Sequence, residues 1–160
     1  MAELFEVAEL VKVAVEDEKT GVAFYSVLAG KCAKPELKDI FARLAEEEKY
    51  HQQRFEQMLA ALGSHKPREE YPGQYMAYLR TLTDERAFPD EATAIRLAGE
   101  CPDDAAAVDL ASRFERDTLM LMHELAGLVP ENDQVVVNEL AEEEQQHLVT
   151  LAKARKTLAG

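Results

Sequence analysis

An eight-residue motif occurs twice in this 160-residue chain, and this repeat constrains the fold more than any other feature of the sequence. Residues 44–51 read LAEEEKYH and residues 140–147 read LAEEEQQH, so six of the eight positions are identical. Each copy lies in a long stretch whose apolar residues recur with helical spacing. Two copies predict one duplicated pair of helices inside a single domain, residues 1–160, rather than a solenoid of stacked repeats.

The prolines and the apolar periodicity together predict four long helices. Each of the six prolines falls where an apolar helical pattern begins or ends, as expected for a residue that disrupts helix interiors. The predicted helices cover residues 2–32, 35–62, 103–128 and 132–158. Gly63 and Ser64 end the second helix, and Asn132 or Asp133 is expected to cap the fourth.

The segment between the second and third long helices, residues 64–102, differs in character. It begins with the polar loop SHKPREE and continues with two shorter amphipathic stretches, near residues 74–87 and 90–100. The first of these has an apolar side formed by Tyr75, Tyr78, Leu79 and Leu82. A crossover of this length allows the four long helices to form two hairpins, so the chain is predicted to be an all-α four-helix bundle with a long helical crossover.

Each predicted long helix carries one glutamate in the middle of its apolar stripe. In the second helix Glu48 lies in the row of Phe41 and Phe55, and equivalent positions hold a glutamate in the other three helices. Two helices add a histidine three residues later. The resulting set is Glu18, Glu48, His51, Glu115, Glu144 and His147. Buried carboxylates without partners are costly, whereas two divalent cations would balance four of them, so the pattern predicts a site for two metal ions.

Simpler interpretations apply to each part of this pattern alone. A histidine on an apolar face is more often a core residue than a ligand, and a run of three glutamates is usually a solvated face. Two Glu-x-x-His copies in phase with the core, each with a partner glutamate one helix earlier, are far more specific. Within each run, Glu48 and Glu144 lie in the apolar row. Glu47 and Glu143 are second choices as ligands, and Glu46 and Glu142 are expected to be exposed.

These motifs resemble the ferritin-like di-iron carboxylate proteins, and within them the rubrerythrin-like branch, whose ligand set is one Glu from each of two helices and Glu-x-x-His from each of the others. The matching stretches are EDEKTGVAFYSVLA, FARLAEEEKYHQQRF, ASRFERDTLMLMHEL and NELAEEEQQHLVTL. The resemblance implies a ferritin-like bundle, two iron ions, bridging by Glu48 and Glu144, and a terminal histidine on each ion. The same ligand types also suit manganese, and zinc can occupy such sites.

The chain departs from full rubrerythrins in three ways. Those proteins hold a further iron with four cysteines, whereas this chain has two, Cys32 and Cys101, and no CxxC motif. Thr118 stands where the family usually has another glutamate, and Met122 stands where the first helix has Tyr25. We therefore expect a separate electron-donor protein.

Two further residues of the first helix lie on its inward side. Tyr25, two turns beyond Glu18, is interpreted as a core aromatic residue in preference to a hydrogen-bonding one. Gly21 either leaves room for an oxygen ligand or lets helices approach closely.

The sequence also excludes some classes of partner. The net charge is −13 and no basic stripe is present, so we expect no nucleic-acid partner. No apolar run approaches the ~20 residues that span a bilayer, and the start MAELFEVAEL lacks the features of a signal peptide. With unpaired cysteines, this predicts a cytoplasmic protein, and we expect a homo-oligomer, a dimer. The predicted function is an oxidoreductase that reduces hydrogen peroxide or dioxygen. The alternatives are a non-enzymatic iron-storage protein of ferritin type and a bundle with purely structural metals.

Overall fold

The computed structural model describes residues 7–63 and 73–160, apart from the side chain of Met76. The predicted helix start at residues 2–6 and the SHKPREE loop, with Ser64, lie outside the described residues. The four long helices are α1 (Val7–Lys31), α2 (Pro35–Leu62), α5 (Asp104–Ala126) and α6 (Glu131–Ala159). The described residues contain no strand, which confirms the all-α prediction.

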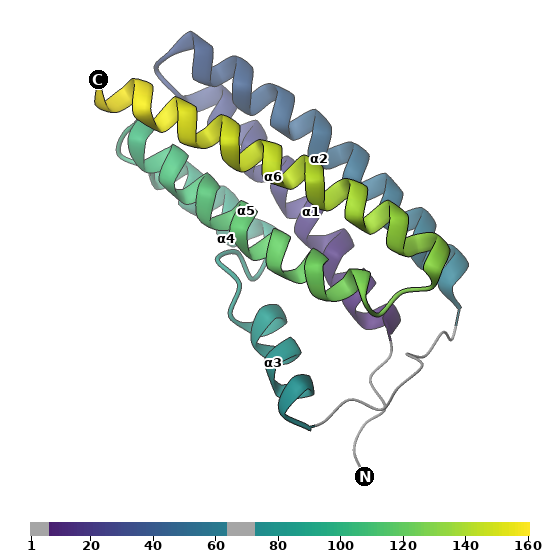
Figure 1. Ribbon diagram of the computed structural model, residues 1–160. Coiled ribbons are helices and arrows are strands. Elements are labelled where there is room, and N and C mark those ends of the chain that lie inside the picture. Colours follow the sequence, from purple (N-terminus) through teal and green to yellow (C-terminus); the bar gives the residue numbers. More distant parts are fainter. Residues whose placement is uncertain (1–6, 64–72) are drawn as a thin grey trace.

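The long helices form two hairpins, as the repeat predicts. Helix α1 packs mainly against α2, and α5 packs mainly against α6, and the four run side by side as one bundle (Figure 1). Contacts of α1 with α5 and of α2 with α6 join the hairpins. The two copies of the motif therefore lie on neighbouring helices.

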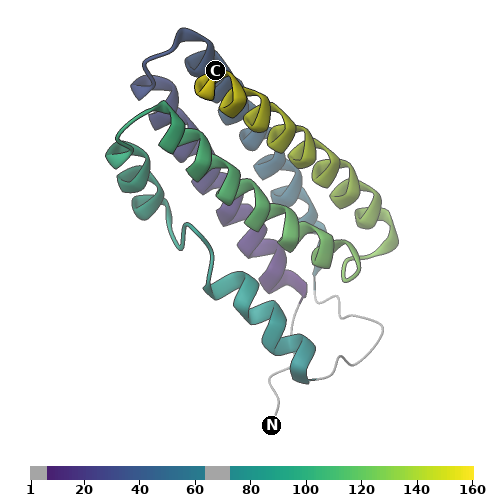
Figure 2. The same ribbon diagram turned by 60° about the vertical axis from the view of Figure 1, so that its left-hand side comes forward.

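The crossover consists of two short helices, α3 (Gly73–Asp84) and α4 (Glu91–Glu100). Helix α3 packs on α5 and α4 packs on α1, so both lie on the outside of the α1–α5 side of the bundle (Figure 2). Leu79 is buried in the core as expected, but Tyr78 is exposed, so its predicted place on the apolar side is wrong. Because α3 contacts the bundle along one narrow stripe, the residue next to Leu79 turns toward solvent.

Local chemistry explains several of the helix ends, but one predicted cap is wrong. Asp90 caps α4 by accepting a hydrogen bond from the Thr93 backbone N–H at 2.7 Å, and Asp103 caps α5 in the same way. Gly63 ends α2 with φ of 57°, a conformation that favours glycine. The predicted cap of α6 at Asn132 or Asp133 is wrong, because α6 begins at Glu131 after Pro130 and both residues lie within its first turn.

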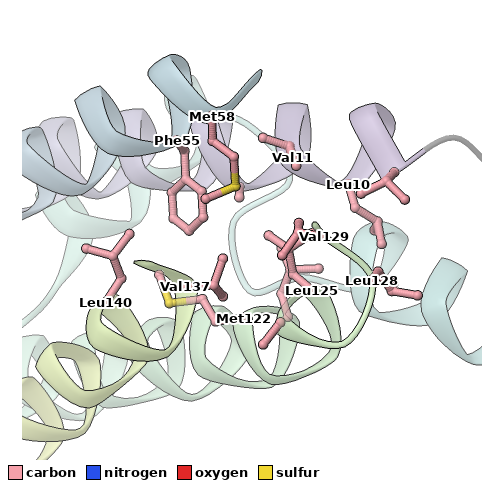
Figure 3. Packing of buried hydrophobic residues seen from close by; sticks show 14 of the residues in the cluster. Leu10, Val11, Phe55, Met58, Met122, Leu125, Leu128, Val129, Val137 and Leu140 are labelled. Carbon is pink, nitrogen blue, oxygen red and sulfur yellow. The ribbon is translucent and has the colours of Figure 1, made fainter. Parts of the chain in front are cut away.

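The apolar core divides into two clusters, one toward each end of the bundle. One contains residues from 7–15, 55–62, 121–129 and 137–141, where Phe55, Met58 and Met122 meet between the helices (Figure 3). The other contains residues from 24–32, 37–45, 107–114 and Leu151. Between these clusters every long helix contributes polar residues at the same level, and this layer is the candidate site.

The link between α3 and α4 is anchored beside this layer. The Arg86 guanidinium donates to the buried carboxylate of Asp17, and the Ala87 backbone N–H donates to Asp117 at 2.8 Å. Phe88 is buried against Phe24, with ring centroids 4.7 Å apart. No helix within the described part of the chain is long and apolar enough to cross a membrane.

Candidate metal centre

The six side chains predicted from the sequence come together in the polar layer. Helix α1 contributes Glu18 and α5 contributes Glu115, while α2 and α6 each contribute one glutamate and one histidine. All four glutamates and His51 are completely buried, and His147 is only 3% exposed. Heptad spacing on four packed helices produces this arrangement, because it keeps each glutamate on the inward face.

The side chains form two overlapping groups of four. The first is Glu18, Glu48, His51 and Glu144, and the second is Glu48, Glu115, Glu144 and His147. Within each group, one ligand atom from every residue lies within 4.8 Å of the others. Glu48 and Glu144 belong to both groups, so the geometry contains two adjacent positions that share two carboxylates.

Both histidines point Nδ1 into the cluster. Nδ1 of His51 lies 2.8 Å from Glu144 Oε1, and Nδ1 of His147 lies 2.9 Å from Glu144 Oε2. The two rings stack with centroids 5.6 Å apart and planes inclined by 12°. Equivalent nitrogens of both histidines are thus directed at the shared carboxylates.

The outer nitrogen of each histidine contacts a glutamate of the opposite helix. Nε2 of His51 lies 2.7 Å from Glu143, and Nε2 of His147 lies 2.7 Å from Glu47. Neither glutamate belongs to the two groups of possible ligands. These second-choice residues instead contact the outer nitrogens of the histidines. The sequence signal was their position one residue before the inward glutamate in both motif copies. Glu46 and Glu142 are exposed as predicted.

Tyr25 reaches the cluster directly. Its buried hydroxyl donates a hydrogen bond to Glu115 Oε1 of α5, so the interpretation as a simple core aromatic is wrong. The ring packs between Phe41 and Phe114, with centroid distances of 5.8 and 6.1 Å. The sequence places Tyr25 on the inward face of α1, but only the packing of α1 against α5 brings Glu115 within reach.

Gly21 serves the close approach of helices. A Cβ atom at position 21 would lie 2.9 Å from Glu48 Oε2 and 3.0 Å from the Phe114 ring. The space is therefore already taken by the shared carboxylate and its aromatic neighbour, and the alternative of room for an oxygen ligand is not supported. Thr118 is buried one turn beyond Glu115, and its Oγ1 has no hydrogen-bond partner among the described residues.

Burial and mutual repulsion disfavour the ionised form of most glutamates in the cluster. Burial, together with the charges of neighbouring glutamates, raises the pKa values of Glu18 and Glu48 well above normal and that of Glu115 to about 8. The burial of Glu144 favours a higher pKa, but hydrogen bonds from Glu115, His147 and His51 lower it. Without a metal ion, protons take the place of cations and neutralise part of the negative charge of these carboxylates.

Protons also collect on the histidines. Burial alone would lower the pKa of His51, but the hydrogen bond and charge of Glu144 raise it to about 9. Burial likewise opposes the charged form of His147, yet hydrogen bonds to Glu115 and Glu144 raise its pKa strongly. The glutamates of the cluster therefore stabilise the positively charged form of both histidines.

The donor set fits divalent metal ions. Several buried atoms form no hydrogen bond of good geometry among the described residues, although some of them lie close to an oppositely charged group: both Oε atoms of Glu18 and Glu48, one of Glu115, one of Glu144, and Nδ1 of His147. Orphaned buried acceptors are rare in native proteins and require an explanation. Carboxylate oxygens and imidazole nitrogens are the ligands that first-row divalent metals prefer.

Comparison with known proteins bears on the same residues. The sequence profile of the rubrerythrin family matches residues 9–155, which include α2 and α5, nearly all of α1 and α6, and the whole cluster. The chain belongs to the rubrerythrin family. Rubrerythrins are di-iron carboxylate proteins, so membership implies iron binding, and the cluster is a set of side chains able to hold metal.

Two solved structures share the ferritin-like fold. One is described as a ferritin-like diiron-carboxylate protein from Thermotoga maritima, with TM-score 0.64, 23% identity and 98% of each chain covered. The other is a hypothetical protein from Pyrococcus furiosus, with TM-score 0.55, 21% identity, and coverage of 97% of this chain and 91% of that one. At these identities the two structures establish the fold. No curated protein matches the chain.

Proposed function

We propose that this member of the rubrerythrin family binds two iron ions in the cluster and is an oxidoreductase that reduces hydrogen peroxide or dioxygen. The observation that carries the proposal is the pair of four-ligand groups sharing Glu48 and Glu144. Two divalent ions carry four positive charges, which match the four buried carboxylates in number. Manganese or zinc would satisfy the same charge balance, but the family favours iron.

Each ion would have its own terminal ligands. Glu18 and His51 would hold one ion, Glu115 and His147 the other, and Glu48 and Glu144 would bridge them. Six side chains over two ions leave coordination positions free, a feature of reactive rather than structural sites. Thr118 adds no carboxylate where rubrerythrins usually have one, which leaves the site more open still.

Two ferrous ions bound there would supply the two electrons that convert hydrogen peroxide and two protons into two waters. The protein contributes orientation and shielding. The Tyr25 hydroxyl donates to Glu115 and restricts its rotation, while the Phe24, Phe41 and Phe114 rings exclude water from that end of the cluster. Preorganised, dry surroundings of this kind strengthen electrostatic interactions with the reacting groups.

The proposal also covers the electron donor, the cellular location and the oligomeric state. This chain has only two cysteines, both free and buried, so it cannot hold the four-cysteine iron of a full rubrerythrin. We therefore propose that a separate protein returns the electrons. Free thiols are consistent with a reducing cytoplasm. We also propose that the protein is a homodimer, and its mass measured by sedimentation tests this.

The proposal is tested by metal analysis and rapid mixing. Protein saturated anaerobically with Fe(II) should bind two ions per chain, and the double variant Glu48→Ala, Glu144→Ala should bind none. Stopped-flow absorbance should show rapid oxidation by peroxide, slower oxidation by dioxygen, and a halt after one cycle unless a reductant is added. Protein that binds two ions but stays ferrous with both oxidants would instead support a structural metal site. Large assemblies holding many irons per chain would support storage.

A further inference from the structure

We infer that the hydroxyl group of Thr118 is a hydrogen-bond donor to the oxidant when it enters the proposed metal centre. This inference rests on the proposed function and deepens it, because it assigns a side chain that binds no metal to the recognition of a small ligand. Thr118 stands where rubrerythrins usually have a glutamate, so this chain has a neutral hydroxyl group in place of a carboxylate.

The hydroxyl group of Thr118 is buried without a partner. The residue is 3% exposed, and its Oγ1 atom forms no hydrogen bond with any described residue. No other buried hydroxyl group in the described part of the chain is left in this condition. An unsatisfied buried polar group destabilises a fold, so it needs an explanation, and a catalytic role or a missing ligand is a common one.

Other hydroxyl groups in the long helices find a partner within their own helix. A serine or threonine hydroxyl group can donate to the backbone carbonyl four residues earlier. Ser112, in the same helix α5, donates in this way to Val108 at 3.0 Å. Thr157 in α6 donates to Lys153 at 3.1 Å. Thr118 forms no such bond, so its O–H group is available to a ligand.

Helix geometry places Thr118 beside the metal centre. Residues three apart share a helix face, and side chains lean toward the helix N-terminus, so Thr118 leans toward the turn that carries Glu115. Tyr25 belongs to the apolar cluster on one side of the polar layer, whereas Met122, one turn beyond Thr118, belongs to the cluster on the other side (Figure 3). Thr118 therefore adjoins the metal position of Glu115 and His147 on the side opposite Tyr25.

The chemistry of the oxidant requires a donor at this position. Ionised carboxylates offer only acceptor atoms, so the four glutamates provide no hydrogen bond to the oxygens of peroxide. Negative charge develops on these oxygens as peroxide accepts electrons, and a donor directed at them stabilises that charge. The Tyr25 hydroxyl group already donates to Glu115, which leaves the O–H group of Thr118 for this role.

The test uses azide as the probe and Thr118→Val as the variant, because valine has nearly the shape of threonine but no hydroxyl group. Iron-loaded protein is oxidised with ferricyanide, and azide affinity is measured from the charge-transfer absorbance. Azide should bind at least about tenfold more weakly to Thr118→Val, whereas Thr118→Ser should keep most of the affinity. Metal-free Thr118→Val should have an equal or higher Tm than the wild type, because the substitution removes an unsatisfied polar group.

Ser112→Ala is the matched control, because it removes a hydroxyl group of α5 that has a backbone partner. It should leave azide affinity unchanged. Unchanged azide affinity in Thr118→Val, or a lower Tm of that variant without metal, would overturn the inference while leaving the metal centre intact. Weaker binding of Fe(II) with unchanged azide affinity would overturn it in favour of a role in orienting Glu115. A wild type that binds no Fe(II) would overturn the proposed function as well.

Discussion

A single methyl group at position 21 should disturb the cluster. The added Cβ of Gly21→Ala would lie 2.9 Å from Glu48 Oε2 and 3.0 Å from the Phe114 ring, so the shared carboxylate or the ring must move. Overpacking of this kind typically costs about 1–3 kcal/mol. We expect Gly21→Ala to unfold at lower denaturant concentration and to bind the second Fe(II) ion more weakly, as measured by urea unfolding and anaerobic titration.

Gly30 offers a matched control on the same helix. Among the described residues, no atom other than the nearby backbone of α1 and the adjoining residues lies within 4 Å of the position that its Cβ would occupy. Gly30→Ala should therefore be neutral or stabilising by up to about 1 kcal/mol, because alanine loses less backbone entropy in a helix. Equal effects of the two substitutions would show that position 21 has no special role.

Tyr25→Phe and His51→Ala should differ in their effects on reactivity. Tyr25→Phe removes the hydroxyl donor to Glu115, and a net hydrogen bond is worth about 0.5–1.5 kcal/mol, so oxidation of the ferrous protein should slow by no more than about tenfold. His51→Ala removes a proposed ligand and should slow it further or abolish binding of one ion. Stopped-flow absorbance compares the two, and a slower Tyr25→Phe variant would contradict this ranking.

At the scale of elements, the crossover should depend on one buried ion pair. Asp17 and Arg86 join α1 to the α3–α4 link with side chains only 7% and 17% exposed. Burial raises the pKa of Asp17 to about 7 even though the Arg86 charge and hydrogen bond lower it. Arg86→Met leaves that carboxylate unpaired, which costs about 3–5 kcal/mol for a buried pair. Urea unfolding at about pH 8 should show this loss.

The loss should shrink at lower pH. Below about pH 5 the unpaired Asp17 is protonated and carries no charge, so Arg86→Met should then approach the wild type in stability. Arg96→Met is the control within the crossover, because its pair with Glu100 is more than half exposed and should be worth about 0.5 kcal/mol. Similar losses for the two arginines, or a loss that does not change with pH, would argue against a buried anchor.

For the whole molecule, stability without metal should fall as pH rises. Glu18, Glu48 and Glu115 have raised pKa values in the fold, so the stability they confer as protonated groups is present below about pH 4.5 and is lost as pH rises through their folded values. His51 acts in the same direction, losing its contribution between about pH 6.5 and pH 9. Glu144, with a lowered pKa, acts oppositely, but only below about pH 4.5.

Thermal melts of metal-free protein should therefore give a higher Tm at about pH 5 than at about pH 8. Each group that titrates in this interval contributes up to about 1.4 kcal/mol per pH unit. Bound Fe(II) or Zn(II) replaces the protons, so the metal-loaded protein should show a smaller pH dependence. Metal-free protein whose Tm is unchanged across this interval would contradict a buried carboxylate cluster. The double variant Glu18→Gln, Glu115→Gln should flatten the profile without metal.

Much of the architecture was predictable because it depends on local chemistry. Helix α2 begins at Pro35 and ends at Leu62 as predicted, since proline and Gly63 mark its ends. The inward rows of Glu48 and His51 follow from helical periodicity, and the repeat predicts their counterparts in α6. The cap of α6 was not predicted correctly, because several polar residues near Pro130 are equally compatible with a helix start.

Sequence by itself determined the helices, their inward faces and the six residues of the cluster, because spacing along one chain fixes which side chains share a face. Only the tertiary structure decided which residues of different helices meet. Three features each involve two helices. They are the hydrogen bond from Tyr25 to Glu115, the lack of space for a side chain at Gly21, and the crossed contacts of Glu47 and Glu143. Such contacts depend on the rotation and offset of one helix against another, which are set by packing of the whole core and leave no spacing signal within either helix.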